Sequence, residues 1–282
     1  MVQRLWKIGD RVLDLSHHGV IMGVLNVTPD SFSDGGEHVD PQRAVEHALA
    51  MAEAGAQIID VGGESTRPRA EPVSLEEELR RVIPIIQAIK ERSDVTISID
   101  TSKSQVADAA INAGATIVND VTGGRGDQEM LPLVSRRGVG VVVMHMQGTP
   151  QTMQVNPHYD DVAGEVANFF RQQYTCALEC DVDPMAMAFD PGIGFGKTLA
   201  HNLELLANVQ RLCVHDRPLV IGVSRKSFLS KVTRTSDMAS RVSATAALTA
   251  LLWTRGAQVF RVHDVTENVA ALRAAEAMVG AE

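Results

Sequence analysis

The stretch VTISIDTSKSQVADAAINAGATIVND, residues 95–120, contains the repeating unit from which the fold of this chain can be inferred. An apolar run ends on Asp100, a segment with helical period follows at residues 104–113, and a second apolar run ends on Asn119. Continuous runs of Val and Ile are typical of parallel strands that are covered by helices on both sides. The stretch therefore predicts a strand, a crossover helix and a second strand parallel to the first.

The same unit recurs on both sides of this stretch, and nearly every apolar run ends at a polar or charged residue. The apolar runs are residues 20–25, 58–61, 95–99, 116–118, 139–144, 186–189, 219–223 and 258–260. Segments with helical period lie at residues 41–55, 74–92, 104–113, 160–179, 202–213, 240–253 and 267–278. Functional side chains at the ends of so many strands favour an α/β fold of the closed (β/α)8 TIM-barrel type over a doubly wound open sheet.

Before the first unit, residues 5–16 alternate around Gly9 and Asp10 and predict an N-terminal β-hairpin that plugs the opposite end of the barrel. The chain has 282 residues, of which 45% are apolar, and barrels of this size commonly form one domain. We expect a single domain over residues 1–282, with the hairpin in 1–18 and the barrel in 19–282.

Charge and hydropathy exclude several classes of partner. The net charge of −9 disfavours nonspecific binding to nucleic acid or to an anionic membrane surface. No apolar run approaches the roughly 18 residues of a membrane-spanning helix, and the first residues lack the apolar core of a signal peptide. We therefore expect a cytoplasmic protein with neither a nucleic-acid nor a membrane partner.

The motifs of nucleophilic and metal-dependent hydrolysis are missing from the sequence. It contains no G-x-S-x-G elbow and no H-E-x-x-H helix. The segment PGIGFGKT, residues 191–198, ends like a phosphate loop, but Pro191 stands where that motif requires glycine. The sequence therefore disfavours hydrolysis of a nucleoside triphosphate.

Two chemical sets of side chains follow the predicted strands. Cations follow strands two, seven and eight, and they are Arg67, Arg225, Lys226, Arg261 and His263. Carboxylates and an amide follow strands three, four and six, and they are Asp100, Asn119 and Asp190. Arginine suits phosphate oxygens, whereas desolvated carboxylates suit a ring with adjacent N–H groups. The sequence predicts one pocket for a bipartite ligand, with a heterocycle deep in the barrel and a phosphate at the rim.

Eight segments in this order strongly resemble dihydropteroate synthase, and the resemblance runs from the first strand to the last helix. They are NVTPDSFSDGG (26–36), DVGGESTRP (60–68), SIDTSK (98–103), VND (118–120), MHMQG (144–148), DPGIGFGK (190–197), SRKS (224–227) and RVHD (261–264). The resemblance implies a TIM barrel and a transferase of folate biosynthesis. Its reaction joins p-aminobenzoate to 6-hydroxymethyl-7,8-dihydropterin diphosphate and releases diphosphate and 7,8-dihydropteroate.

The resemblance also implies a role for individual residues. The pterin would be held by Asp100, Asn119, Asp190 and Lys226, between walls formed by Val121, Met144 and Phe195. Asn26 would coordinate Mg²⁺ on the diphosphate, and the anion would be surrounded by Thr66, Arg67, Arg261 and His263. Phe32 and Pro68 would close the p-aminobenzoate site. Among these residues, a direct part in catalysis is expected of Asn26, Arg67, Asp100, Lys226, Arg261 and His263, together with Asp34, and either Asp34 or Asp100 could assist the proton balance.

Several expectations go beyond the pocket. The resemblance implies a homodimer and inhibition by sulfonamides, and the apolar late helix at residues 240–253 fits either an interface or a core position. Arg69 stands where the family usually has glycine, and it is either a solvated side chain or a tuner of affinity for p-aminobenzoate. Three alternatives stay open: a pterin-binding methyltransferase, a non-catalytic ligand-binding relative, and a barrel that only binds a partner.

Overall fold

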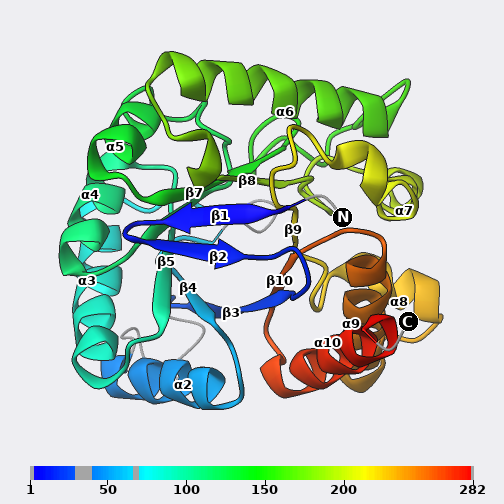
Figure 1. Ribbon diagram of the computed structural model, residues 1–282, viewed down its shortest axis with the longest axis horizontal. Coiled ribbons are helices and arrows are strands. Elements are labelled where there is room, and N and C mark those ends of the chain that lie inside the picture. The colour runs from blue at the N-terminus through cyan, green and yellow to red at the C-terminus, as the bar shows by residue number, and fades with distance from the viewer. Residues whose placement is uncertain (1–2, 29–39, 66–69, 281–282) are drawn as a thin grey trace.

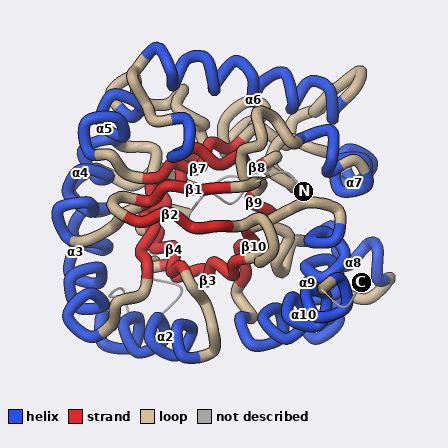
Figure 2. The backbone as a smooth tube through the Cα atoms, in the orientation of Figure 1, coloured by secondary structure: helices blue, strands red, loops and turns tan. Residues whose placement is uncertain are grey.

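The computed structural model describes residues 3–28, 40–65 and 70–280, in which parallel strands form a barrel ringed by helices (Figures 1 and 2). The 8-stranded sheet has the order β8-β7-β6-β5-β4-β3-β10-β9. Its strands are β3 (Val20–Asn26), β4 (Ile58–Gly62), β5 (Thr96–Asp100), β6 (Ile117–Asp120), β7 (Gly140–Met144), β8 (Met187–Asp190), β9 (Val220–Ile221) and β10 (Val259–Val262).

The two ends of this sheet meet, so that the predicted (β/α)8 barrel is confirmed. A parallel bridge joins Phe189 to Leu219, and the backbone N–H of Phe189 donates to Pro218 O at 2.9 Å. The strand β9 is shorter than the predicted run at 219–223, because a turn in which Lys226 N donates to Val223 O takes the chain out of the sheet.

Helices cover the outside of the sheet. They are α2 (Pro41–Glu53), α3 (Leu75–Arg92), α4 (Ser104–Ala113), α5 (Met130–Arg137), α6 (Val162–Glu179), α7 (Leu199–Ala207), α8 (Ser227–Thr233), α9 (Met238–Thr254) and α10 (Val265–Val279), with short 3-10 turns η1 (Pro184–Ala186) and η2 (Val209–Leu212). Two predicted starts are confirmed by their caps: Asp40 accepts from two N–H groups of α2, and Ser74 accepts from Glu77 N of α3. The helices α5 and α8 were not predicted, because eight and seven residues are too few to display a clear helical period.

The predicted hairpin closes the amino-terminal end of the barrel. Its strands β1 (Leu5–Ile8) and β2 (Arg11–Asp14) pair antiparallel and lie across the barrel in Figure 1. Trp6 and Ile8 are buried against the first residues of the barrel strands, and the indole N–H of Trp6 donates to Ala186 O at 2.9 Å. With this end plugged by side chains, the polar ends of the strands are left at the opposite rim.

None of the helices within the described parts of the chain is both long enough and apolar enough to cross a membrane.

Candidate active site

Polar side chains gather at the carboxyl ends of the barrel strands, as the sequence predicted. Asn26 and Asp190 are the last residues of β3 and β8, Asp100 is the last of β5, and Asn119 and Arg261 are next to last in β6 and β10. Asp100, Asn119 and Asp190 are buried, whereas Asn26 and Arg261 are half-buried. The barrel therefore holds carboxylates, amides and a cation together at the rim where parallel strands end.

An arginine lies between two carboxylates on one side of this rim. Arg261 donates through Nε to Asp60 Oδ2 at 2.6 Å and through Nη2 to Asp100 Oδ2 at 2.7 Å. The same Asp60 oxygen accepts from Nδ2 of Asn119 at 3.0 Å. The predicted acidic and cationic sets are thus interleaved rather than separated, because a buried carboxylate requires a nearby positive charge or donor.

Burial controls the ionisation of this group. Desolvation raises the pKa of Asp100 to about 7; Arg261 opposes the shift and Asp60 adds to it. For Arg261, burial alone would lower the pKa, but Asp60 and Asp100 together outweigh it and hold the pKa above its ordinary value. Arg261 stays charged, whereas Asp100 changes its charge near neutral pH.

A second group lies between β8 and β9. Asp190 accepts from Gly192 N at 2.7 Å, and Lys226 donates through Nζ to Ile193 O. Burial raises the pKa of Asp190, with Lys226 opposing, and burial lowers the pKa of Lys226 to about 8. A β-carbon on Gly222 would meet Asp190 Oδ2 at 3.9 Å and Lys226 Nζ at 4.0 Å, so glycine leaves the space between them open.

The three residues that are expected to wall the pocket lie together, beside two further methionines. Val121 and Met144 form a buried cluster with two further methionines, Met146 and Met153, and Phe195 packs against this cluster. The ammonium of Lys226 lies 4.6 Å from the centre of the Phe195 ring, within the range of a cation–π contact. A planar ligand at this place would have sulfur and aromatic surfaces on one side and ionic groups at its edge.

Of the other predicted cations, His263 lies at the rim, whereas Arg225 is paired with Asp264. His263 contacts the Ser224 hydroxyl through its backbone N and through Nδ1, both at 3.1 Å. Arg225 donates through Nε to Asp264 at 2.9 Å and forms a second bond to the same carboxylate. The expectation that Arg225 takes part in binding an anion is therefore not supported, because Asp264 already pairs with its guanidinium.

Five predicted site residues lie outside the described part of the chain. They are Phe32, Asp34, Thr66, Arg67 and Pro68, and the same holds for Arg69. Their segments continue from Asn26 at the end of β3 and from Glu64 shortly after β4.

Buried ionic residues that the sequence reasoning missed surround the site. Asp60 is completely buried within β4. The sequence could have indicated it, because a charged residue inside an apolar run is rarely buried unless it has a partner. Lys103 pairs with Glu64 and, at 2.6 Å, with the buried Glu78. These residues connect the segment that follows β4 to α3 and to the start of α4.

A further buried pair lies behind the apolar wall. Lys197 Nζ lies 3.0 Å from Nδ1 of His145 and donates to Phe195 O at 2.9 Å. Desolvation lowers the pKa of Lys197 to about 7 and that of His145 to about 2. The lysine that made residues 191–198 look like a phosphate loop thus points inward and ties the backbone beside Phe195.

Comparison with known proteins agrees with this arrangement. Residues 22–263 match the family model described as pterin binding enzyme. The dihydropteroate synthase of Escherichia coli K12 is 46% identical over 270 residues, covering 96% of this chain and 95% of the relative.

Solved structures give the same result. A Xanthomonas albilineans dihydropteroate synthase with 4-aminobenzoic acid has a TM-score of 0.91 and 42% identity, covering 99% of both chains. A Yersinia pestis dihydropteroate synthase in a sulfonamide drug complex has a TM-score of 0.91 and 41% identity, covering 99% of this chain and 100% of the other. With a family match over most of its length and near-complete overlap with these relatives, the chain belongs to the pterin-binding enzymes and, among them, to the dihydropteroate synthases.

Proposed function

We propose that this protein condenses 6-hydroxymethyl-7,8-dihydropterin diphosphate with p-aminobenzoate, giving 7,8-dihydropteroate and diphosphate for folate biosynthesis. The observation that carries the proposal is the buried rim of Asp100, Asn119 and Asp190 beside Lys226 and Arg261, in a chain aligned with dihydropteroate synthases over nearly its whole length. We assign the whole chain, residues 1–282, to a single pterin-binding domain whose first 18 residues form the hairpin, and we place it in the cytoplasm.

The pterin fits the deep part of the pocket. Its amino and ring N–H groups are donors, and the side chains of Asp100, Asn119 and Asp190 offer oxygens as acceptors. Lys226 supplies a donor for a ring carbonyl or nitrogen. Val121, Met144 and Phe195 supply the apolar faces between which a flat ring is held.

The chemistry is a substitution at the methylene carbon of the pterin. The bond from this carbon to the diphosphate oxygen breaks, the amine nitrogen of p-aminobenzoate forms a new bond to the carbon, and the amine loses a proton. Such a reaction needs no protein nucleophile, because the pterin ring can delocalise positive charge as the diphosphate leaves. The protein has to stabilise the anion and exclude water. We assign the first task to Arg67, Arg261 and His263.

The proton that the amine loses is assigned to one of two carboxylates, Asp100 or Asp34. The pKa of Asp100 is raised to about 7, mainly by burial, so this carboxyl can bind or release a proton near neutral pH. Asp34 is the other candidate for this role. The amine of p-aminobenzoate is already neutral at pH 7 and needs chiefly to be positioned.

We assign a Mg²⁺ site to Asn26 and the substrate. The amide oxygen of Asn26 is a hard ligand at the end of β3, and Mg²⁺ commonly takes few protein ligands together with phosphate oxygens and water. When bound, the ion would neutralise charge on the diphosphate. Asn26 itself would orient that group over the barrel mouth.

The second substrate binds above the pterin, where the segments after β3 and β4 begin. We assign Phe32 and Pro68 to this part of the site and Thr66 to the surroundings of the diphosphate. Arg69 is either a solvated side chain or a tuner of affinity for p-aminobenzoate. The Xanthomonas relative binds 4-aminobenzoic acid and the Yersinia relative binds a sulfonamide drug. We propose the same ligands for this protein, with sulfonamides as competitors of p-aminobenzoate.

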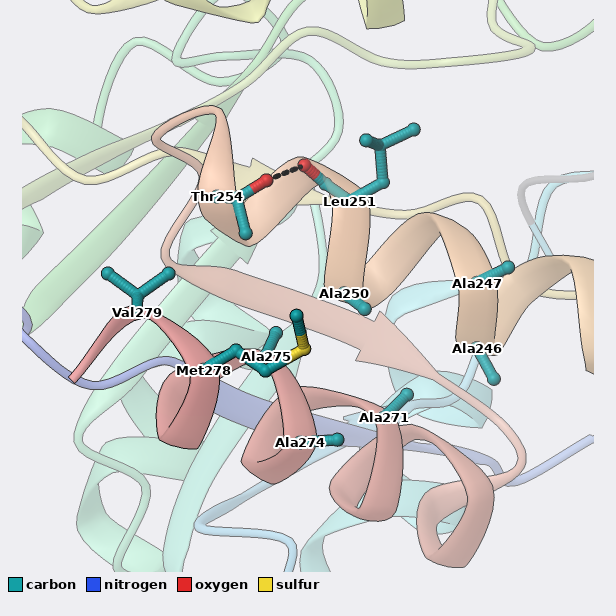
Figure 3. Close-up of a pocket in the computed structure, with 10 residues that line it drawn as sticks. All are labelled: Ala246, Ala247, Ala250, Leu251, Thr254, Ala271, Ala274, Ala275, Met278 and Val279. Atoms are coloured by element: carbon teal, nitrogen blue, oxygen red, sulfur yellow. Dashed lines mark hydrogen bonds between the residues drawn. The ribbon is translucent and has the colours of Figure 1, made fainter. Parts of the chain in front are cut away.

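We also propose that two copies of the chain associate through α9 and α10. Between these helices lies a groove of about 570 Å³ that is lined almost entirely by apolar side chains (Figure 3). Leu251 and Met278 line it and are 45% and 75% exposed. Exposed apolar surface of this kind favours burial against another protein surface, and a homodimer fits both this surface and the family.

The proposed reaction is tested by release of diphosphate from the pterin diphosphate in the presence of Mg²⁺, with and without p-aminobenzoate. We expect release that depends on p-aminobenzoate and that a sulfonamide inhibits competitively. Asp190→Ala and Arg261→Ala should each lower kcat/KM by at least about a hundredfold, because the first removes a buried carboxylate and the second leaves the buried Asp60 and Asp100 without their shared cation. Release that does not depend on p-aminobenzoate would exclude the proposed reaction, and wild-type rates in both variants would exclude the proposed site.

A further inference from the structure

We infer that Asp60 is a positioning residue, whose carboxylate holds the Asn119 amide and the Arg261 guanidinium in the orientations in which they meet the pterin; this inference rests on the proposed function. Asp60 is not itself expected to touch the substrate. It is fully buried in the middle of β4, below the residues that end the strands.

One oxygen atom of Asp60 joins two distant strands. Its Oδ2 accepts from Asn119 Nδ2 at 3.0 Å and from Arg261 Nε at 2.6 Å. In the sheet, β6 lies two strands from β4 on one side and β10 lies two strands from it on the other. A single buried carboxylate thus sets two site residues that approach from opposite sides.

The charge of Asp60 decides which end of the Asn119 amide faces the pocket. An ionised carboxylate accepts hydrogen bonds and cannot donate them, so Asn119 must turn its NH₂ group toward Asp60. Its Oδ1 is then left for the ligand. Among the described residues no group donates a hydrogen bond to this oxygen. The oxygen is not fully buried either, so it is partly exposed. An acceptor here matches a ring N–H, whereas a rotated amide would set two donors against each other.

Asp60 also fixes the plane of Arg261. The guanidinium donates to Asp60 through Nε and to Asp100 through Nη2, and two bonds to separate carboxylates leave a planar group little freedom to rotate. Without Asp60, the guanidinium could turn toward Asp100 alone. Its placement against the ring and the departing anion would then be lost.

The surroundings of Asp60 argue against a purely structural role. Its Oδ1 is buried without a partner, and so is Oγ of Ser98, the residue paired with Asp60 in the neighbouring strand β5. An apolar side chain like the flanking Ile59 and Val61 would pack here without that desolvation penalty. The fold therefore does not require a charge at position 60, and orientation of Asn119 and Arg261 accounts for its presence.

The test compares four variants of the full-length protein with the wild type. Asp60→Asn removes the charge at constant size, and Asn119→Asp places two carboxylates face to face. The double variant D60N/N119D restores a donor and an acceptor in exchanged positions, so that residue 119 still offers an oxygen to the ligand. Ser98→Ala is the matched control, because it lies beside Asp60 in the neighbouring strand and is equally buried.

We expect D60N to raise the KM for the pterin diphosphate, and its Kd in calorimetry, by about tenfold, which is the usual scale for one charge-assisted hydrogen bond. N119D should raise KM and Kd further than D60N does, and S98A should leave both within about twofold of wild type. The double variant should bind the pterin diphosphate more tightly than either single variant. Thermal unfolding of all variants separates loss of binding from loss of fold. A purely structural Asp60 predicts no such rescue by the double variant.

The pH profile gives a second readout. The charges that act on Asp100 are Arg261, Asp60, Glu78 and Asp120, and Asp60 is among those that raise its pKa. Removing the Asp60 charge should therefore move the acid limb of kcat/KM to lower pH, and S98A should leave it in place. If D60N matches S98A in KM and pH profile, or if the two single effects simply add in the double variant, the inference is wrong. A wild-type protein that forms no product would instead overturn the proposed function.

Discussion

At the scale of single residues, burial shifts the pKa values of two groups at the barrel mouth toward neutral pH. Desolvation raises the pKa of Asp100 to about 7 and lowers that of Lys226 to about 8. Asp100 carries its charge above its pKa, whereas Lys226 carries its charge below its pKa. The pair is thus ionised together over a narrow range between the two values.

This range predicts a bell-shaped dependence of kcat/KM on pH for the pterin diphosphate. Activity should rise as the pH passes about 7, because Asp100 becomes an acceptor, and fall above about 8, because Lys226 loses its proton. Lys226→Arg should remove the alkaline limb, because a guanidinium stays protonated at this pH. The variant also shows whether the limb is caused by Lys226 or by the buried Lys197, whose pKa is lowered as well. An alkaline limb that persists unchanged in K226R would show that Lys226 does not cause it.

At the scale of an element, the loop after β8 carries Phe195 and has glycine at tight positions, of which Gly192 is the tightest. Gly192 has φ +64, and a β-carbon there would lie 1.9 Å from the backbone oxygen of His145. Gly138, which ends α5, has nearly the same φ of +62, but a β-carbon there would meet nothing within 4 Å. Alanine would therefore be strained by the left-handed backbone at both positions, and only at Gly192 would it also collide with the main chain.

We predict that Gly192→Ala lowers affinity for the pterin diphosphate by more than about tenfold and lowers the melting temperature. Gly138→Ala should cost only the left-handed strain, about 1 kcal/mol in unfolding free energy, and leave affinity unchanged. Calorimetric titration and thermal unfolding of both variants measure the two effects. Equal behaviour of the two variants would mean that the close approach of Gly192 to His145 is not needed for binding.

At the scale of the whole molecule, the groove between α9 and α10 predicts a dimer. Leu251→Glu places a charge in this groove and should convert the dimer into a monomer in sedimentation velocity, because burying an unpaired charge is strongly unfavourable. Val12→Glu is the matched control, since Val12 is similarly exposed, at 51%, on the hairpin and does not line the groove. Dimers in both variants would place the contact elsewhere, and a monomeric wild type would remove the proposal.

The sequence predicted the barrel because each strand has a local pattern, such as the apolar run of residues 95–99 followed by Asp100. The resemblance of their motifs also grouped Val121, Met144 and Phe195, which lie together in the structure, and their contact with a ligand stays a prediction. The sequence could not predict the role of Asp60, because this depends on distances to β6 and β10 that no local pattern contains. Nor could it separate Arg225 from Lys226, which are adjacent in sequence but contact Asp264 and the loop after β8, respectively.

The identity and amount of the product show whether this barrel joins a pterin to p-aminobenzoate. Purified protein, Mg²⁺, 6-hydroxymethyl-7,8-dihydropterin diphosphate and p-aminobenzoate are incubated, and the mixture is analysed by mass spectrometry together with a diphosphate assay. We expect 7,8-dihydropteroate and diphosphate in equal amounts, with neither formed by Asp190→Ala at a comparable rate. Diphosphate released without 7,8-dihydropteroate, or no reaction by the folded wild-type protein, would contradict the proposed reaction.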